Sequence, residues 1–151
     1  MFMILSKNIA VAALTYLFLN NEEINIANAK KSVVNHYQQY QAEKEFGVKK
    51  ASFELSNNGF IRYRRTGNDN KVEYFSVKMD KILNVDYLGT EKMGWLVIKC
   101  LEESVIYQTY QDNKGNVDDM IAEIKIPIKN IDITEINVWV NDINNLKASK
   151  F

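Results

Sequence analysis

The spacing of the apolar residues changes twice along the chain, and this limits the fold more than any other feature of the sequence. Before residue 50, apolar residues recur every three or four positions, which is typical of helices. From residue 50 to 129 they form short runs that largely alternate with polar residues, as in half-buried strands, and after residue 132 the helical spacing returns. This order predicts an α+β fold in which helices flank one antiparallel sheet.

The first 47 residues are predicted to form two helices that pack as a hairpin. Ser6 can cap the first helix, and Asn21 can cap the second because the acidic pair Glu22-Glu23 follows it. Gly47 would end the second helix. The apolar run at residues 9–19 falls on the first helix, and we expect it to pack in the core.

The same apolar run allows two other interpretations. Lys7 followed by an apolar stretch is how an export signal begins, although Glu22 and Glu23 fall where such a signal should be uncharged. As a membrane span the run is short, at about 11 residues against the ~20 needed. We therefore expect a cytoplasmic protein, with export or membrane anchoring through residues 2–19 as the alternative.

Seven strands are predicted between residues 50 and 129, separated by residues that favour turns. Asn57-Asn58-Gly59 is a hairpin turn that tolerates positive φ, and Pro127 should lie at a strand end or edge because it has no N–H. The predicted strands are 51–55, 60–65, 72–79, 82–88, 95–101, 105–110 and 121–128.

The last predicted helix covers residues 132–148. The segment from Asp132 to Glu135 has the pattern of a capping box, in which Asp132 accepts from the backbone and Glu135 reaches back. One apolar stripe then follows, formed by Ile136, Trp139, Val140, Ile143 and Leu146. With 151 residues, the chain fits a single domain that this helix closes.

Seven short strands followed by one amphipathic helix is the element order of pleckstrin-homology-like (PH-like) domains. The stretch IKIPIKNIDITEINVWVNDINNL, from Ile124 to Leu146, resembles the last strand and closing helix of bacterial members of that group. The resemblance extends over roughly residues 50–148 and implies a rolled antiparallel sheet. A cone of the NTF2-like type, with helices followed by a curved sheet, is the alternative.

Composition and motifs argue against several classes of function. Lysine plus arginine equals aspartate plus glutamate, 19 against 19, so no overall field attracts nucleic acid. The single cysteine, Cys100, lies in an apolar run and is expected to be buried. One histidine and one cysteine cannot form a zinc site, and the sequence contains no phosphate-binding glycine motif. We expect no enzyme activity, cofactor or metal.

A basic cluster is the main candidate site, formed by Lys50, Arg62, Arg64, Arg65 and Lys71. Arg62 and Arg64 alternate on one strand and should share a face. The spacing of these residues resembles a pattern by which some PH domains bind phosphoinositides: Lys50 is followed, after eleven residues, by Arg62-Tyr63-Arg64. The resemblance would give the phosphate contacts to Lys50, Arg62 and Arg64; a solvated strand face and an acidic protein partner are the alternatives.

These observations favour a non-catalytic protein-interaction domain, such as an inhibitor or immunity protein that neutralises a toxin by binding. The strand tyrosines are expected to be half-buried sheet residues, and they would add to a protein-contact surface if several lie on an open sheet face; they are Tyr74, Tyr87, Tyr107 and Tyr110. One alternative is a PH-like, membrane-proximal module that binds anionic lipid. Another is a small-molecule carrier, or an enzyme, with an NTF2-like conical sheet.

Overall fold

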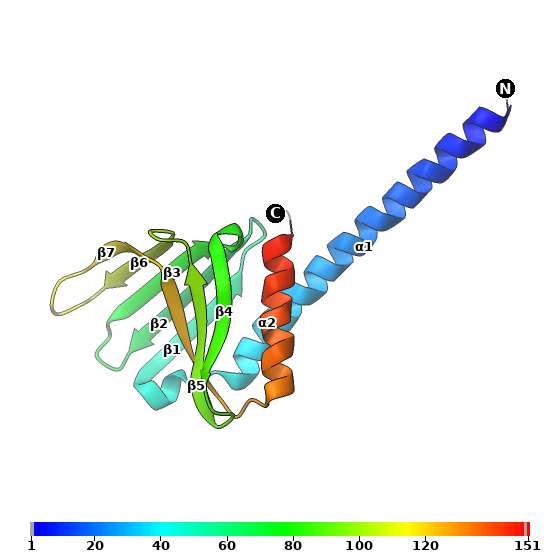
Figure 1. The fold of residues 1–151 in the computed structure, drawn as a ribbon. Helices are drawn as coiled ribbons and strands as arrows, with labels where there is room; N and C mark the ends of the chain where they lie inside the picture. Colours follow the sequence, from blue (N-terminus) through cyan, green and yellow to red (C-terminus); the bar gives the residue numbers. More distant parts are fainter. Residues whose placement is uncertain (1, 150) are drawn as a thin grey trace.

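The computed structural model describes the backbone of residues 2–149 and 151, and the side chains of residues 11, 14–149 and 151 (Figure 1). The described residues form an α+β structure, as predicted, with a helix at each end. The elements are α1 (Phe2–Tyr40), η1 (Glu43–Phe46), β1 (Val48–Leu55), β2 (Phe60–Gly67), β3 (Val72–Lys78), η2 (Met79–Lys81), β4 (Ile82–Gly89), β5 (Met93–Cys100), β6 (Val105–Tyr110), β7 (Asp118–Ile121), β8 (Glu123–Lys129) and α2 (Ile133–Ala148).

The strands form two antiparallel sheets. The five-stranded sheet has the order β1-β2-β3-β6-β7, and the three-stranded sheet has the order β4-β5-β8. After β3 the chain builds β4 and β5 in the second sheet, and it then returns so that β6 pairs with β3 and β8 with β5. Pro127 lies on the edge strand β8, as expected, and its carbonyl accepts a hydrogen bond from Ala42 N at 2.9 Å.

The described residues contain eight strands rather than the seven predicted. The predicted strand at 121–128 is in fact two strands, β7 and β8, which belong to different sheets. The chain passes from one sheet to the other at Ala122, whose carbonyl accepts a hydrogen bond from Cys100 N at 2.7 Å. The apolar pattern continues across this crossing, so it does not mark the boundary.

The predicted N-terminal hairpin is wrong, because residues 2–40 form one continuous helix. Asn20 and Asn21 lie inside α1, and the sequence from residue 20 to 40 contains no glycine or proline to break it. The helix ends at Tyr40, and Gly47, with φ of 73°, caps η1 instead. A potential capping residue does not start a new helix where the preceding turn continues without strain.

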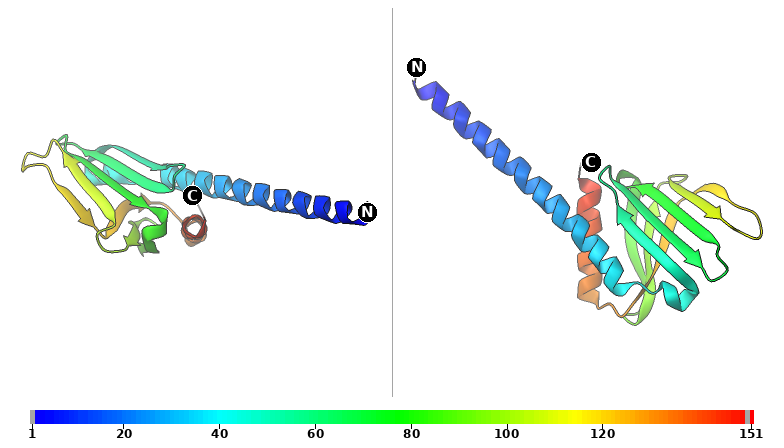
Figure 2. Two further views of the ribbon diagram at one scale, coloured as in Figure 1. Left: turned by 90° about the horizontal axis from the view of Figure 1, so that it is seen from above. Right: turned by 180° about the vertical axis from the view of Figure 1, so that it is seen from behind.

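The first half of α1 projects away from the sheets, so the expectation that residues 9–19 pack in the core is also wrong (Figures 1 and 2). The described apolar side chains of this segment are between 56% and 68% exposed; they are Val11, Leu14, Tyr16, Leu17, Phe18 and Leu19. Within the described part of the chain, no helix is both long and apolar enough to cross a membrane.

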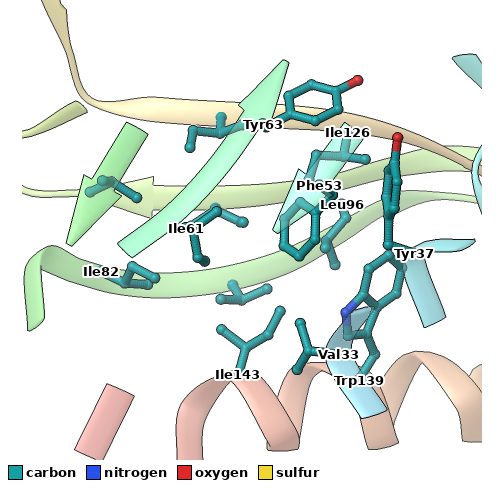
Figure 3. Packing of buried hydrophobic residues seen from close by; sticks show 14 of the residues in the cluster. Val33, Tyr37, Phe53, Ile61, Tyr63, Ile82, Leu96, Ile126, Trp139 and Ile143 are labelled. Carbon is teal, nitrogen blue, oxygen red and sulfur yellow. The ribbon is translucent and has the colours of Figure 1, made fainter. Parts of the chain in front are cut away.

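The core lies between the two sheets and is closed by the second half of α1 together with α2 (Figure 3). Val33 and Tyr37 enter it from α1, and Trp139 and Ile143 enter it from α2. Asp132 accepts a hydrogen bond from Glu135 N at 3.0 Å, as the predicted capping box requires. The carboxylate of Glu135 turns instead towards α1, so the other half of the box does not form.

Removing residues 1–20 is expected to leave the folded domain intact. The described large apolar side chains of the deleted part are exposed, whereas packing against the core begins near Ile26 and Ala29. A chain that starts at Asn21 should therefore unfold in one cooperative transition, within a few degrees of the full-length midpoint in thermal denaturation. Loss of that transition would show that residues 9–19 are buried in solution.

Candidate functional site

The five-stranded sheet has one face directed away from the core, which we call the outer face. Alternation along each strand and the pairing registers define its residues, since directly paired residues lie on the same side of a sheet. Its members are Lys50, Ser52, Glu54, Phe60, Arg62, Arg64, Thr66, Val72, Tyr74, Ser76, Lys78, Ile106, Gln108, Tyr110, Asp118 and Met120.

No described helix or strand lies across this face. Viewed from behind, β1 and β2 are in front and α1 runs beside the sheet (Figure 2, right). Tyr110 and Met120 are 47% and 44% exposed, Phe60, Tyr74 and Ile106 are half-buried, and Val72 and Ser76 are buried between their neighbours. The outer face therefore combines accessible aromatic and aliphatic groups with polar ones, and Tyr74 and Tyr110 lie on it.

Arg64 lies at the centre of the β1–β2 part of the outer face, paired in register with Ser52 on one side and Tyr74 on the other. Among the described residues, no carboxylate forms an ion pair with it. Together with Lys50, Ser52 and Thr66, it lines a shallow hollow of about 110 Å³. This hollow offers two cations and two hydroxyl groups to a small anionic group.

Arg62 shares the outer face with Arg64, as the alternation predicted. Its Nη1 lies 3.3 Å from Glu54 Oε1 on β1, and both side chains are largely exposed. An exposed pair of this kind contributes at most about 1 kcal/mol to stability, so little holds Arg62 in this contact. A partner carboxylate could replace Glu54 at small cost.

Two of the five predicted site residues lie away from the outer face. Arg65 points to the core side, where its Nε is 2.5 Å from Glu73 Oε2 and its guanidinium lies over the ring of Phe75. Burial opposes ionisation of Glu73, but the hydrogen bond and charge of Arg65 outweigh it and hold the pKa of Glu73 below its usual value. Lys71 pairs with Asp112 at 2.8 Å. Both cations are thus already neutralised.

A buried carboxylate was missed in the sequence. Glu43 is 2% exposed, and its Oε1 accepts hydrogen bonds from the hydroxyl groups of Tyr37 at 2.7 Å and Tyr63 at 3.1 Å. Burial, and after it the nearby carboxylate, raises the pKa of both tyrosines well above the usual value. The local sequence around Glu43 is charged and resembles a solvated turn, so nothing in it indicates burial.

The only histidine links the two helices, which the sequence did not indicate. His36 Nε2 is 2.9 Å from Glu135 Oε2 on α2, and Nδ1 is 2.8 Å from the carbonyl oxygen of Ser32. Ser32 Oγ lies 3.4 Å from His36 Nδ1, but it donates its hydrogen to Asp142 Oδ2 at the shorter distance of 2.5 Å. A hydroxyl hydrogen directed to a carboxylate is not shared with the histidine, so in this arrangement Ser32 and His36 do not form a nucleophile–base hydrogen bond. The group joins α1 to α2.

Cys100 is buried, as expected, and burial raises the pKa of its thiol to about 11, which makes it unreactive at neutral pH.

The described residues contain no group of three or more histidine, cysteine, aspartate or glutamate side chains placed to hold a metal. Comparisons of the chain with protein-family models, curated proteins and solved structures found no match. The outer face is therefore the feature on which a functional assignment can rest.

Proposed function

We propose that this protein is a non-catalytic domain that binds a protein partner through the outer face. The observation that carries the proposal is a five-stranded sheet face left open, with arginine, tyrosine and aliphatic side chains side by side. Tyrosine and arginine are enriched among the residues that dominate binding energy at interfaces. The specific form proposed is an inhibitor or immunity protein that occludes a toxin.

The size of the outer face suits this role. The five strands lie about 4.8 Å apart and average roughly 20 Å in length, although the four-residue β7 extends over only about 13 Å, so the surface measures about 24 Å by 20 Å. That is large enough for a small protein interface. Two larger hollows, one between β4 and α2 and one beside Phe46 and Trp95, are open to solvent, which favours contact with a partner surface over enclosure of a small molecule.

The charge on the outer face indicates the chemistry of the partner. Four cations lie on it, Lys50, Arg62, Arg64 and Lys78, against the two anions Glu54 and Asp118. The cations gather on β1, β2 and β3, and the exposed apolar side chains Tyr110 and Met120 lie on β6 and β7. A protein surface with carboxylates beside an apolar patch would complement this arrangement.

For the fold we propose a PH-like roll. Two antiparallel sheets with the core between them, and a C-terminal helix that follows the last strand and closes the core, support this assignment. An NTF2-like cone is the rival, since a long N-terminal helix also precedes the strands. The proposed binding surface does not depend on this choice, because it follows from strand pairing alone.

The substitution Arg64→Glu is expected to weaken partner binding without unfolding the domain. With a photo-reactive residue in place of Tyr74, the partner should be cross-linked in the native host and can then be purified. Reversing the charge at the centre of the outer face should slow association at low salt by about tenfold or more, because electrostatic steering acts on the on-rate. The melting temperature should hardly change, since Arg64 forms no ion pair among the described residues.

Lys92→Glu is the matched control, because Lys92 is exposed in the turn between β4 and β5, away from the outer face. Equal slowing by both variants would show an effect of net charge and would contradict the proposed surface. The hollow beside Lys50 and Arg64 favours anionic lipid as a second candidate. Binding of the wild type to acidic vesicles that Arg64→Glu abolishes, with unchanged association to the purified partner, would establish lipid instead.

A further inference from the structure

The first half of α1 presents a continuous apolar surface that no other described element covers. Its described apolar side chains, from Val11 to Leu19, are all more than half exposed, and the helix projects clear of both sheets (Figures 1 and 2). An apolar run of 10–14 residues is typical of a core helix, an interfacial segment or the apolar part of an export signal. The structure excludes the first of these for this segment.

The apolar side chains point in all directions around the helix axis. Successive residues of an α-helix are turned by about 100°, so the six described apolar side chains leave no gap wider than about 100° around the axis. A helix that packs against one protein surface needs one apolar stripe and a polar remainder. This segment has no polar side, so an environment that surrounds it completely fits best.

The segment carries two hydroxyl groups, on Thr15 and Tyr16, and that of Thr15 is satisfied within the helix. Thr15 Oγ1 donates a hydrogen bond to the carbonyl oxygen of Val11 at 2.8 Å. A threonine that bonds back to its own helix presents no free donor to the surroundings, which is what an apolar solvent requires. The polar residues begin immediately afterwards, at Asn20, Asn21, Glu22 and Glu23.

We propose that residues 9–19 of α1 insert into the apolar layer of a lipid bilayer, with the sheets remaining in water. At 1.5 Å per residue the run is about 16 Å long, close to half of the ~30 Å hydrocarbon layer. A run of this length reaches into the layer without extending across it. A second copy of the chain is the weaker occupant, because a two-helix contact would cover one side of each helix and leave the rest in water.

Flotation with neutral phosphatidylcholine vesicles tests this proposal on the full chain. The wild type should float with the vesicles in both about 0.15 M and about 0.5 M salt, because salt screens electrostatic attraction but does not screen an apolar contact. Leu14→Asp combined with Phe18→Asp should lower the partition coefficient by about a hundredfold or more, since a carboxylate is strongly disfavoured in the hydrocarbon layer.

Asn21→Asp combined with Asn25→Asp is the matched control. It adds the same charge at the same spacing on exposed positions of α1, beyond the apolar run, and should float like the wild type. Arg64→Glu should also float, which separates this proposal from the proposed outer-face function. All variants should keep the wild-type melting transition, because neither pair of positions touches the core.

A second measurement places the segment directly. Cys100 is buried and unreactive, so a cysteine introduced at Leu17 can be labelled alone with an environment-sensitive dye. Its emission should shift to the blue when phosphatidylcholine vesicles are added, whereas a dye at Asn28 should not respond. If the wild type stays below the vesicles, or the Leu14→Asp, Phe18→Asp variant floats equally well, the proposal is overturned. If the wild type forms dimers but does not float, and the Leu14→Asp, Phe18→Asp variant is monomeric, the segment would instead bind a second copy of the chain.

Discussion

Replacing Trp139 with alanine is expected to lower the free energy of unfolding by about 3–5 kcal/mol. Trp139 is 1% exposed and lies where α2 meets α1 (Figure 3). Its ring stacks on that of His36, with centroids 5.8 Å apart. Truncation would leave a cavity between two helices and the sheets, and it would remove the contact that orders His36. Urea denaturation of the two proteins under identical conditions measures the difference.

Trp139→Phe is the control for this prediction. Trp139 Nε1 is buried and has no hydrogen-bond partner among the described residues, so phenylalanine removes an unsatisfied donor while keeping much of the apolar volume. It should therefore cost clearly less than alanine. A loss below about 1 kcal/mol for Trp139→Ala would mean that α2 packs only loosely, and would count against a PH-like roll closed by this helix.

The stability of the protein is expected to fall steeply above pH 10. Tyrosine usually ionises at 10.0, and in the folded protein burial and the carboxylate of Glu43 raise the pKa of Tyr37 and Tyr63 well above that value. The unfolded chain therefore loses the two tyrosine protons at a lower pH than the folded chain does, and this deprotonation favours the unfolded state. The contribution of the two tyrosines to stability is fully present below pH 10 and is lost as the pH rises above it. Two such tyrosines lower the unfolding free energy by about 2 kcal/mol between pH 10 and 11.

The control replaces the whole buried group by apolar side chains, in the triple variant Glu43→Leu, Tyr37→Phe, Tyr63→Phe. Removing donors and acceptor together leaves no unsatisfied partner, so the variant should fold at neutral pH. Other groups that titrate in the same range are common to both proteins and cancel in the comparison. Urea midpoints measured from pH 9 to 11 should diverge; parallel profiles would show that the tyrosines are solvated.

Local sequence patterns predicted the secondary structure better than its connections. The hairpin turn at Asn57-Asn58-Gly59 and the start of α2 at Asp132 depend on a few neighbouring residues, and both are present. The division of residues 118–129 between two sheets depends on which distant strands are available for pairing. The continuity of α1 was missed because capping residues favour a helix start but do not interrupt a helix already formed.

Three residues of the predicted basic cluster lie on one face of the sheet, and for a physical reason. Alternation along β2 placed Arg62 and Arg64 on one face, and the pairing registers bring Lys50 beside them. The same alternation sends Arg65 to the opposite face, where it pairs with Glu73. Burial of Glu43 could not be anticipated, because its two tyrosine partners come from α1 and β2 and meet only in the folded chain.

The unbroken α1 has a mechanical consequence. Between Leu19 and Ser32 the helix rises by about 20 Å without a glycine or proline hinge, and from Ser32 onwards it is held against α2 by the contacts of Ser32 and His36. A contact that fixes the orientation of the N-terminal end therefore also fixes the tilt and rotation of the sheets, because the continuous helix joins the two rigidly. On a surface, partners would meet the outer face at one height and in one orientation, and the search would be confined to two dimensions.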